Sequence, residues 1–488
     1  MKKGLLILCA LLIFACTKSG ADEPEVIFSS NSIIDVSSSL KSNMVLQQNS
    51  TFNIKGKGTA GELLRITCSW ESKPQTIKVA QDESWTLSVS TPSASMNPVS
   101  VTIEGKYIKT FSNILVGEVW ICAGQSNMQM FLRSTENGAQ AAADANYPKI
   151  RLLNMTRKTA TTPQESFDAE WIPCMPSTAG DFSAVGYYFG QKLYTELQVP
   201  IGLIAANWGN TAIEVWMNSQ WVSGDTQLAA DADLRTTGHT DGSPYLAGSA
   251  YNAMIYPLKG IPIAGTIWYQ GENNQGSPYV YPKFLKTMID GWRGIWQLQF
   301  PFYISQIAPY QRMWNYMTYY SNPAMRYSQA EATKSIAGTA IEINDDIGNI
   351  ADIHPTNKKD VGNRLAYLAL GQTYGKQNFS TLRSPVYKDM TVSGNKIIII
   401  FNFAEGGLKT ADGLSPYMFE ICGADKIFYP ATGKISGSSV ELTSSSVTAP
   451  IAARLGWSYT KVTNLRSSND LPVSVFKTYQ WADSSEEN

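Results

Sequence analysis

One serine of this chain is placed where a nucleophile could act. Gly-Gln-Ser-Asn-Met at residues 124–128 follows the apolar run Ile114–Ala123, so Ser126 stands at the mouth of a predicted buried strand. A serine hydroxyl needs a nearby base at neutral pH, most often a histidine. The chain has only two histidines, His239 and His354. Ser126 could also be a helix N-cap, so a nucleophile is one of two interpretations.

The sequence around the two histidines favours His354 as the base. Asp352 lies two residues before it, in a loop that precedes a predicted helix. In such a loop the carboxylate can hold one ring nitrogen while the other faces Ser126. His239 lies in a turn-rich stretch, residues 237–242, with no strand leading into it.

Two further polar loops follow predicted strands. Residues 207–211 include Gly209, whose backbone N–H is a possible donor, and residues 268–274 offer side-chain amides. Amide donors aimed at the developing negative charge are what acyl transfer requires. Each loop alone could be a polar turn. Together with the serine and histidine loops, they predict an acyl-transfer site at the strand ends of one α/β region.

The elements that must position these loops alternate along the chain. Predicted strands cover 114–123, 201–205, 264–268, 302–307 and 339–343, and predicted helices cover 184–197, 281–292, 326–334 and 357–370. Strands that alternate with helices of this length indicate βαβ units around a parallel sheet. Ligands of such sheets bind beyond the carboxyl ends of the strands, where all four loops fall. The predicted fold class is therefore α/β, with a catalytic domain over residues 113–380.

Short strands without helices flank this region on both sides. Residues 40–112 show period-two alternation broken by Gly and Pro, which predicts an N-terminal β-sandwich module. Residues 385–482 have the same character, with a hairpin signal at Gly394-Asn395, and predict a C-terminal β module.

The amino terminus has the features of an export signal. Lys2 and Lys3 precede the apolar stretch Leu5–Ala15, which is too short for a permanent membrane span. The following Cys16 gives this end a resemblance to the bacterial lipobox, which implies lipidation at Cys16 after removal of residues 1–15. We therefore expect an exported bacterial lipoprotein, periplasmic or associated with the outer membrane, held to the membrane only by the lipid. The alternative is a plain secretory signal with an incidental cysteine.

The composition limits the classes of binding partner that we expect. The net charge of −1 argues against nucleic acid, which needs a basic surface. Aromatic residues reach 11% while charged residues are only 16%, which suits sugar contacts and an aromatic-rich core equally well. The cysteines are widely and irregularly spaced, so the sequence predicts no metal site and no disulfide framework.

Four blocks give the chain a resemblance to a known family. Residues 117–128, 208–216, 267–274 and 352–366 resemble the SGNH (GDSL-like) hydrolase superfamily, and specifically the sialate O-acetylesterase family. The resemblance implies an SGNH-type, flavodoxin-like three-layer domain between the two β modules. It also implies a serine esterase that removes O-acetyl groups from carbohydrate without a metal or cofactor.

Carried over to this sequence, the family pattern makes Ser126 the nucleophile and His354 the general base. The superfamily usually spaces its acid and base as Asp-x-x-His, and here Ala351 occupies the expected aspartate position. Either Asp352 orients the histidine, or Asp346 does, or the site works as a Ser–His dyad.

The family pattern also implies an oxyanion hole. Its donors would be the N–H groups of Ser126 and Gly209 and an amide from residues 270–274. The superfamily's Gly-x-Asn pattern points to Asn273, whereas the Gln-Gly-Glu of the sialate-esterase-like branch points to Gln270, which we favour. Arg326, at the start of a predicted helix, is a candidate for binding the substrate carboxylate.

The expected substrate is an O-acetylated glycan, most of all O-acetylated sialic acid. An esterase of acetyl xylan or another polysaccharide would use the same chemistry on a different sugar. A non-catalytic, sugar-binding surface lipoprotein is the alternative from a different class.

Overall fold

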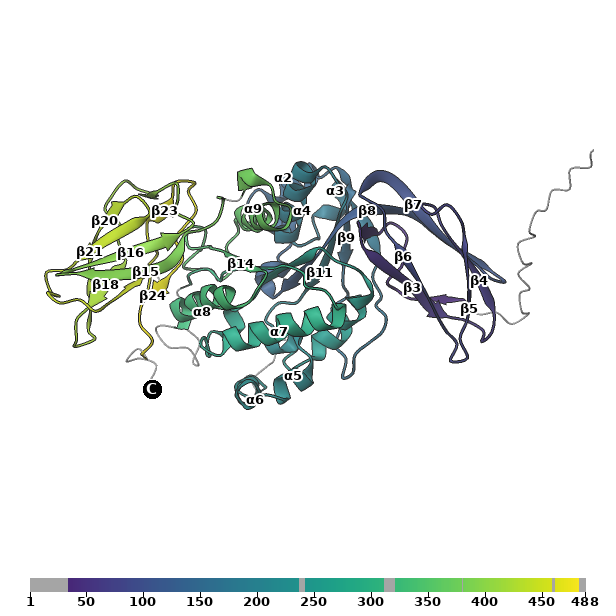
Figure 1. The fold of residues 1–488 in the computed structure, drawn as a ribbon, viewed down its shortest axis with the longest axis horizontal. Coiled ribbons are helices and arrows are strands. Elements are labelled where there is room, and N and C mark those ends of the chain that lie inside the picture. The colour runs from purple at the N-terminus through teal and green to yellow at the C-terminus, as the bar shows by residue number, and fades with distance from the viewer. Residues whose placement is uncertain (1–33, 237–241, 311–320, 380, 459–460, 482–488) are drawn as a thin grey trace, which may run out of the picture.

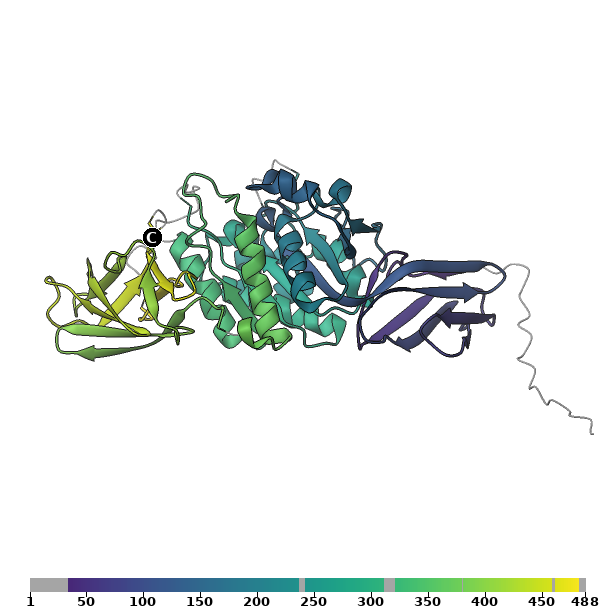
Figure 2. The same cartoon turned by 90° about the horizontal axis from the view of Figure 1, so that it is seen from above.

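The computed structural model describes residues 34–236, 242–310, 321–379, 381–458 and 461–481. Three parts follow one another along the long axis: strands of the N-terminal module, a central α/β domain, and strands of the C-terminal module (Figures 1 and 2). Cys16 and His239, with the predictions made for them, lie outside the described residues. Among the helices that are described, none has the length and apolar character needed to cross a bilayer.

The central sheet has the order β10-β9-β11-β8-β12-β13-β14, and all neighbours are parallel except the edge pair β9 and β10. Its strands are β8 (Ile108–Gly124), β9 (Tyr147–Asn154), β10 (Trp171–Cys174), β11 (Ile201–Asn207), β12 (Gly265–Tyr269), β13 (Phe302–Ser305) and β14 (Thr339–Glu342). The chain leaves β8 toward β9 and β11 on one side and later adds β12 on the other. The carboxyl end of β8 is thus a topological switch point, where such sheets bind ligands.

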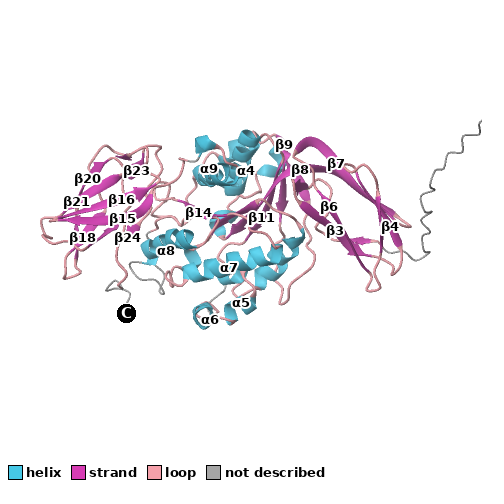
Figure 3. Ribbon diagram, viewed as in Figure 1, coloured by secondary structure: helices cyan, strands magenta, loops and turns pink. Residues whose placement is uncertain are grey.

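Helices cover both faces of this sheet (Figures 1 and 3). The main ones are α4 (Ala184–Leu197) and α9 (Lys358–Leu368) on one face, and α7 (Tyr281–Trp296) and α8 (Ser321–Ser335) on the other. Shorter helices are α1 (Ser126–Gln129), α2 (Gly138–Ala143), α3 (Pro176–Ala179), α5 (Ser219–Ser223) and α6 (Thr226–Asp233). Alternate side chains of β8 enter opposite cores: Trp120 and Cys122 pack with α4 and α9, and Ile121 lies in the cluster that includes α7. The predicted three-layer α/β class is confirmed.

The N-terminal module shares a strand with the central domain. One sheet contains β1 (Asp35–Val36), β3 (Thr51–Lys57) and β6 (Ser84–Ser90), and β2 (Val45–Gln47), β4 (Leu63–Cys68), β5 (Gln75–Lys78) and β7 (Ser95–Glu104) join the sheet of β8. The first part of β8 pairs with β7, and its last seven residues pair with β11. The predicted boundary between residues 112 and 113 therefore falls inside one continuous strand.

The C-terminal module has two four-stranded antiparallel sheets around a shared core (Figure 3). One contains β15 (Val386–Ser393), β16 (Lys396–Asn402), β20 (Thr432–Ser436) and β21 (Ser439–Thr443); the other contains β18 (Phe419–Cys422), β19 (Phe428–Pro430), β22 (Ala452–Leu455) and β24 (Phe476–Lys477). A small additional pair consists of β17 (Leu408–Thr410) and β23 (Leu465–Ser467). The predicted hairpin turn lies between β15 and β16, where Gly394 has a φ of +60°.

Strand β9 was not predicted, because charged residues interrupt its apolar run. Arg151 is nevertheless buried, and it donates hydrogen bonds to the carbonyls of Pro148 and Asn43 and to Asn113 Oδ1. A buried guanidinium is tolerated when oxygens satisfy it in this way. The missed strand matters for the site, because Arg157, which follows its carboxyl end, lines the cleft at Ser126.

Candidate active site

The chain turns sharply at the end of β8 to present Ser126. Gly124 has a φ of +139°, and a Cβ atom at this position would lie 2.1 Å from the carbonyl oxygen of Tyr269. Only glycine fits there. Ser126 then begins helix α1, where the first N–H groups have no acceptor within the helix. The hydroxyl and the N–H of Ser126 are thus both presented at the switch point.

His354 reaches Ser126 from the loop between β14 and α9. Its Nε2 lies 2.9 Å from Ser126 Oγ, although 228 residues separate the two in the chain. Its own backbone N–H donates to Asp352 Oδ1 at 2.9 Å. The structure therefore brings the predicted nucleophile and base within hydrogen-bond distance.

Asp352 and Asp346, the two carboxylates considered for orienting the histidine, are placed differently. Asp352 Oδ1 is 3.7 Å from His354 Nδ1, which is longer than a hydrogen bond, and 54% of the Asp352 side chain is exposed. Asp346 binds Arg364 through both carboxylate oxygens and also accepts from Arg466. Of the two, Asp352 is the carboxylate beside the imidazole, whereas Asp346 is paired with Arg364 and Arg466.

A network of buried polar side chains contacts the loop that carries His354 and holds it in place. Asn127 Nδ2 donates to the carbonyl of Ile353 at 3.0 Å and to Glu272 Oε1 at 2.5 Å. Lys358 Nζ donates to Asn127 Oδ1 at 2.5 Å. These three side chains were missed in the sequence, although Asn127 directly follows Ser126 and Lys358 lies four residues after His354. They connect the nucleophile turn, the amide loop and the histidine loop.

Burial shifts the pKa values of this network. Desolvation lowers the pKa of Lys358 to about 7, against the opposing effect of Glu272 and other carboxylates, and it raises the pKa of Glu272. The pKa of His354 is lowered by burial and by the Lys358 cation, whereas Asp352 raises it. His354 is therefore neutral at neutral pH, as a proton acceptor must be.

These shifts predict how activity depends on pH. The reaction requires a neutral His354. We therefore expect kcat/KM to fall only when the pH drops to the pKa of His354, which lies below the ordinary value of 6.5. Asp352→Asn removes a charge that raises this pKa and should move the acid limb to lower pH. Lys358→Met removes a cation that lowers it and should move the limb to higher pH. Rates of p-nitrophenyl acetate hydrolysis measured against pH check both shifts; shifts in the same direction would contradict this electrostatic account.

Gly209 lies beside Ser126 at the end of β11. A Cβ atom at Gly209 would be 3.4 Å from Ser126 Cβ, so the backbones approach closely here. The Gly209 N–H donates to Gln129 Oε1 at 2.6 Å. Gln129, which the sequence analysis did not single out, thus holds this donor from the helix that carries Ser126. A carbonyl oxygen entering the site would compete with Gln129 for it.

Gln270, the preferred third donor, does not lie in the cleft in this structure. Gln270 is fully buried; its amide nitrogen donates to Thr211 O and Asn274 Oδ1, and its oxygen accepts from the Tyr281 hydroxyl. It does not line the cleft, because it continues directly from strand β12 into the core.

Asn273, the alternative amide, lies in the cleft beside Ser126. Its Nδ2 donates to the carbonyl of Asn210 at 3.1 Å, and its backbone N–H donates to Gln125 Oε1 at 3.3 Å. Because Gln125 precedes Ser126, it holds the Asn273 loop against the nucleophile turn.

The cleft at Ser126 has a volume of about 480 Å³. It is lined by Gln125, Ser126, Gln129, Arg157, Trp208, Gly209, Asn210, Ser243, Glu272, Asn273, Ile353 and His354. Arg157 is its exposed cation and follows the missed strand β9. Within the described chain, no group of three or more His, Cys, Asp or Glu side chains is arranged to hold a metal ion.

The suggestion of Arg326 as a cleft cation is wrong. Arg326 is fully buried within α8, where it pairs with Asp345 at 2.8 Å and donates to the carbonyls of Gly456 and Ser458. It connects the central domain to the C-terminal module, and no part of it reaches the cleft.

Comparisons with known proteins agree with this geometry. Residues 116–370 match the family described as carbohydrate esterase, sialic acid-specific acetylesterase. The chain is 29% identical over 406 residues to the sialate O-acetylesterase of Rattus norvegicus, which covers 71% of this chain and 74% of the rat protein. It is 29% identical over 318 residues to the Homo sapiens enzyme, which covers 58% of each chain.

A solved structure is similar over nearly the whole chain. The crystal structure of a carbohydrate acetylesterase from Xanthomonas citri has a TM-score of 0.83 and 31% identity, and the match covers 92% of this chain and 100% of that one. The family match itself spans more than half of the chain. The resemblance inferred from the four sequence blocks is thereby confirmed, and this chain belongs to the sialic acid-specific acetylesterase family of carbohydrate esterases.

Proposed function

We propose that this esterase hydrolyses O-acetyl groups with Ser126 as nucleophile and His354 as general base. The observation that carries the proposal is the 2.9 Å contact between Ser126 Oγ and His354 Nε2. Ser126 attacks the acetyl carbonyl while His354 accepts its proton and returns it to the leaving sugar hydroxyl. Water, activated by the same histidine, then releases acetate and frees the serine. The same contact disfavours a purely sugar-binding role.

The carbonyl oxygen becomes negatively charged during each attack. We assign its stabilisation to the N–H of Ser126, the N–H of Gly209 and the side-chain amide of Asn273, all beside the nucleophile. Asp352 holds the histidine loop through the backbone N–H of His354 and lies near its ring.

For the substrate, we propose O-acetylated sialic acid. The support is Arg157, whose exposed guanidinium lines the cleft and makes no hydrogen bond or ion pair with other described residues. Sialic acid carries a carboxylate, and a guanidinium binds a carboxylate with two parallel hydrogen bonds. A neutral acetylated polysaccharide such as acetyl xylan would leave this cation without a partner.

Acetate release from a panel of substrates tests this assignment. O-acetylated sialic acids should be hydrolysed with higher kcat/KM than acetylated xylooligosaccharides. Arg157→Met should raise KM for the sialic acids about tenfold and leave hydrolysis of the neutral p-nitrophenyl acetate unchanged. Equal loss on neutral and acidic substrates would show that Arg157 does not recognise the carboxylate. Faster hydrolysis of the xylooligosaccharides by the wild-type protein would favour the polysaccharide alternative.

We also propose that the chain is exported and anchored through Cys16. The support is the signal-like stretch Leu5–Ala15 after Lys2 and Lys3, together with the cysteine that follows it. In bacterial cells the wild-type protein should incorporate labelled palmitate and sediment with membranes. Cys16→Ser should abolish the label and move the protein to the soluble fraction. Membrane association that persists without the label would contradict a lipid anchor.

A further inference from the structure

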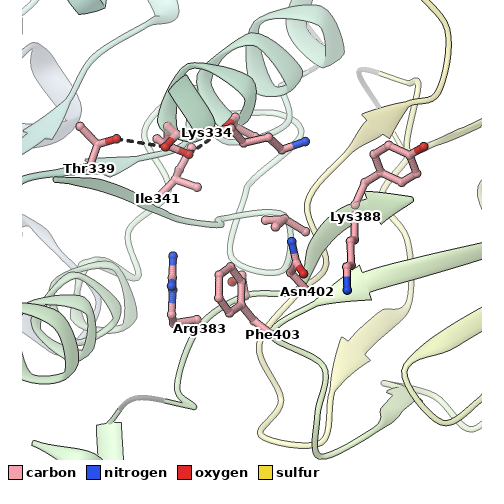
Figure 4. Close-up of a pocket in the computed structure, with 12 residues that line it drawn as sticks. Lys334, Thr339, Ile341, Arg383, Lys388, Asn402 and Phe403 are labelled. Carbon is pink, nitrogen blue, oxygen red and sulfur yellow. Dashed lines mark hydrogen bonds between the residues drawn. The ribbon is translucent and has the colours of Figure 1, made fainter. Parts of the chain in front are cut away.

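A second pocket, of about 250 Å³, lies where the central domain meets the C-terminal module (Figure 4). One wall comes from α8 and β14, and the other from β15, β16 and the residues just before β15. It shares no lining residue with the cleft at Ser126. A molecule bound there would therefore not be the reacting ester.

The lining of this pocket is cationic. It includes Lys334 from α8, Arg383 before β15 and Lys388 from β15, and none of the described residues that line it is acidic. Lys334 pairs with Glu331 outside the lining. Arg383 and Lys388 make no hydrogen bond or ion pair within the described chain. Two cations without a bonded partner beside one cavity favour an anionic ligand.

Arg383 is held in a fixed position. Its guanidinium carbon lies 3.6 Å from the centroid of the Phe403 ring, and the two groups lie face to face (Figure 4). Phe403 itself has a φ of +60°, which is rare for a bulky residue. Burial lowers the pKa of Arg383 more than Tyr303 and the Glu405 carboxylate, which is outside the lining, raise it, so the group is partly desolvated. A carboxylate gains more from a guanidinium that is already ordered and partly removed from water.

The remaining lining residues suit a sugar ring better than a simple ion. Asn402 and Ser384 offer an amide and a hydroxyl for sugar hydroxyl groups, and the rings of Tyr387 and Phe403, which stack on Phe476 and on Arg383, complete the lining. We propose that this pocket binds a carboxylate-bearing sugar unit of an acidic glycan, with the carboxylate on Arg383 and the Lys388 cation adding to the positive charge of the same cavity. The site is independent of the esterase reaction and would hold a glycan by a second point of contact.

Titration calorimetry on the full chain tests the proposal. The Arg157→Met variant is the starting protein, because it removes the cation of the catalytic cleft. N-acetylneuraminic acid and glucuronic acid should each bind saturably, glucose should not bind over the same concentrations, and inorganic phosphate should bind at least about tenfold more weakly. Adding Arg383→Met or Lys388→Met should weaken binding of both acids about tenfold and leave p-nitrophenyl acetate hydrolysis unchanged.

Control variants allow the binding measurement to be interpreted. Lys388 is exposed, so Lys388→Met tests the site even if Arg383→Met fails to fold. Lys409→Met, on the same module but paired with Asp470, should change nothing. Absence of binding by both acids, or unchanged affinity in the Lys388 variant, would overturn the proposal. Phosphate binding as tight as that of the acids would overturn the assignment to a sugar. Adding Ser126→Ala should leave binding intact, so failure of this site and failure of the esterase assignment are distinguishable.

Discussion

Ser126→Ala and His354→Ala should each lower kcat for p-nitrophenyl acetate by at least about 10³-fold, and the double variant should lose no more than the worse single one. The two side chains share one hydrogen bond and act in one proton transfer, so removal of either disables both. Without the imidazole, the serine hydroxyl keeps its proton and remains a poor nucleophile. Steady-state kinetics of the three variants, with thermal unfolding to verify the fold, provide the measurement.

Two further variants act as controls for this pair. Ser243→Ala removes a second hydroxyl that lines the same cleft, and it should cost less than about tenfold in kcat. Asp352→Asn should also lower kcat by no more than about tenfold, because the carboxylate is 3.7 Å from His354 Nδ1 and more than half exposed. A loss with Asp352→Asn as large as with His354→Ala would contradict a Ser–His pair and require a full triad. Near wild-type activity in His354→Ala would mean that the base is misassigned.

The sequence was sufficient to predict that Ser126 and His354 lie together, because each stands out for a physical reason. A serine that follows a long apolar run must emerge at the end of a buried strand, and a chain with two histidines offers few bases. Parallel sheets then bring the carboxyl ends of distant strands to one edge. The helix Ala184–Leu197 was predicted with its observed bounds, because it has clear periodicity and is followed by a strand.

Side-chain direction and burial could not be read from the same patterns. Gln270 and Asn273 belong to one short loop of amides, yet one enters the core and the other faces the cleft. The choice depends on where strand β12 stops and the backbone turns, at Gly271 with a φ of +153°. Arg326 appeared to be an accessible cation at a helix start, but the C-terminal module buries it through contacts more than a hundred residues away.

Arg157 was missed for a different reason. It follows strand β9, and that strand was not predicted because Lys149 and Arg151 interrupt its apolar residues. Only the tertiary contacts of Arg151 make its burial acceptable, and these join residues far apart in the chain. Without the strand, nothing in the sequence places the following loop at the edge of the cleft.

Asn273→Ala should lower kcat by about 10²- to 10³-fold while KM and the melting temperature change little, because removal of one oxyanion-hole donor has this effect in acyl transfer. Asn273 is half-buried at the cleft, and its side chain has one hydrogen bond, to Asn210 O, so little of the fold depends on it. The tetrahedral intermediate would lose a donor in a site where the N–H groups of Ser126 and Gly209 remain. Single-turnover measurements with p-nitrophenyl acetate would locate the loss in acylation, deacylation or both.

Gln270→Leu is the matched control, because it removes an amide from the same loop and was the donor expected from the sequence. The buried Gln270 amide bonds Thr211, Asn274 and Tyr281, so its removal leaves these groups without a partner and should lower the melting temperature. The folded protein should keep kcat within about tenfold of wild type, since Gln270 does not reach the cleft. The opposite pattern, with normal turnover in Asn273→Ala and a hundredfold loss in folded Gln270→Leu, would return the oxyanion role to Gln270. It would also require residues 270–274 to rearrange when substrate binds, because Gln270 would have to leave its buried hydrogen bonds to meet the developing charge.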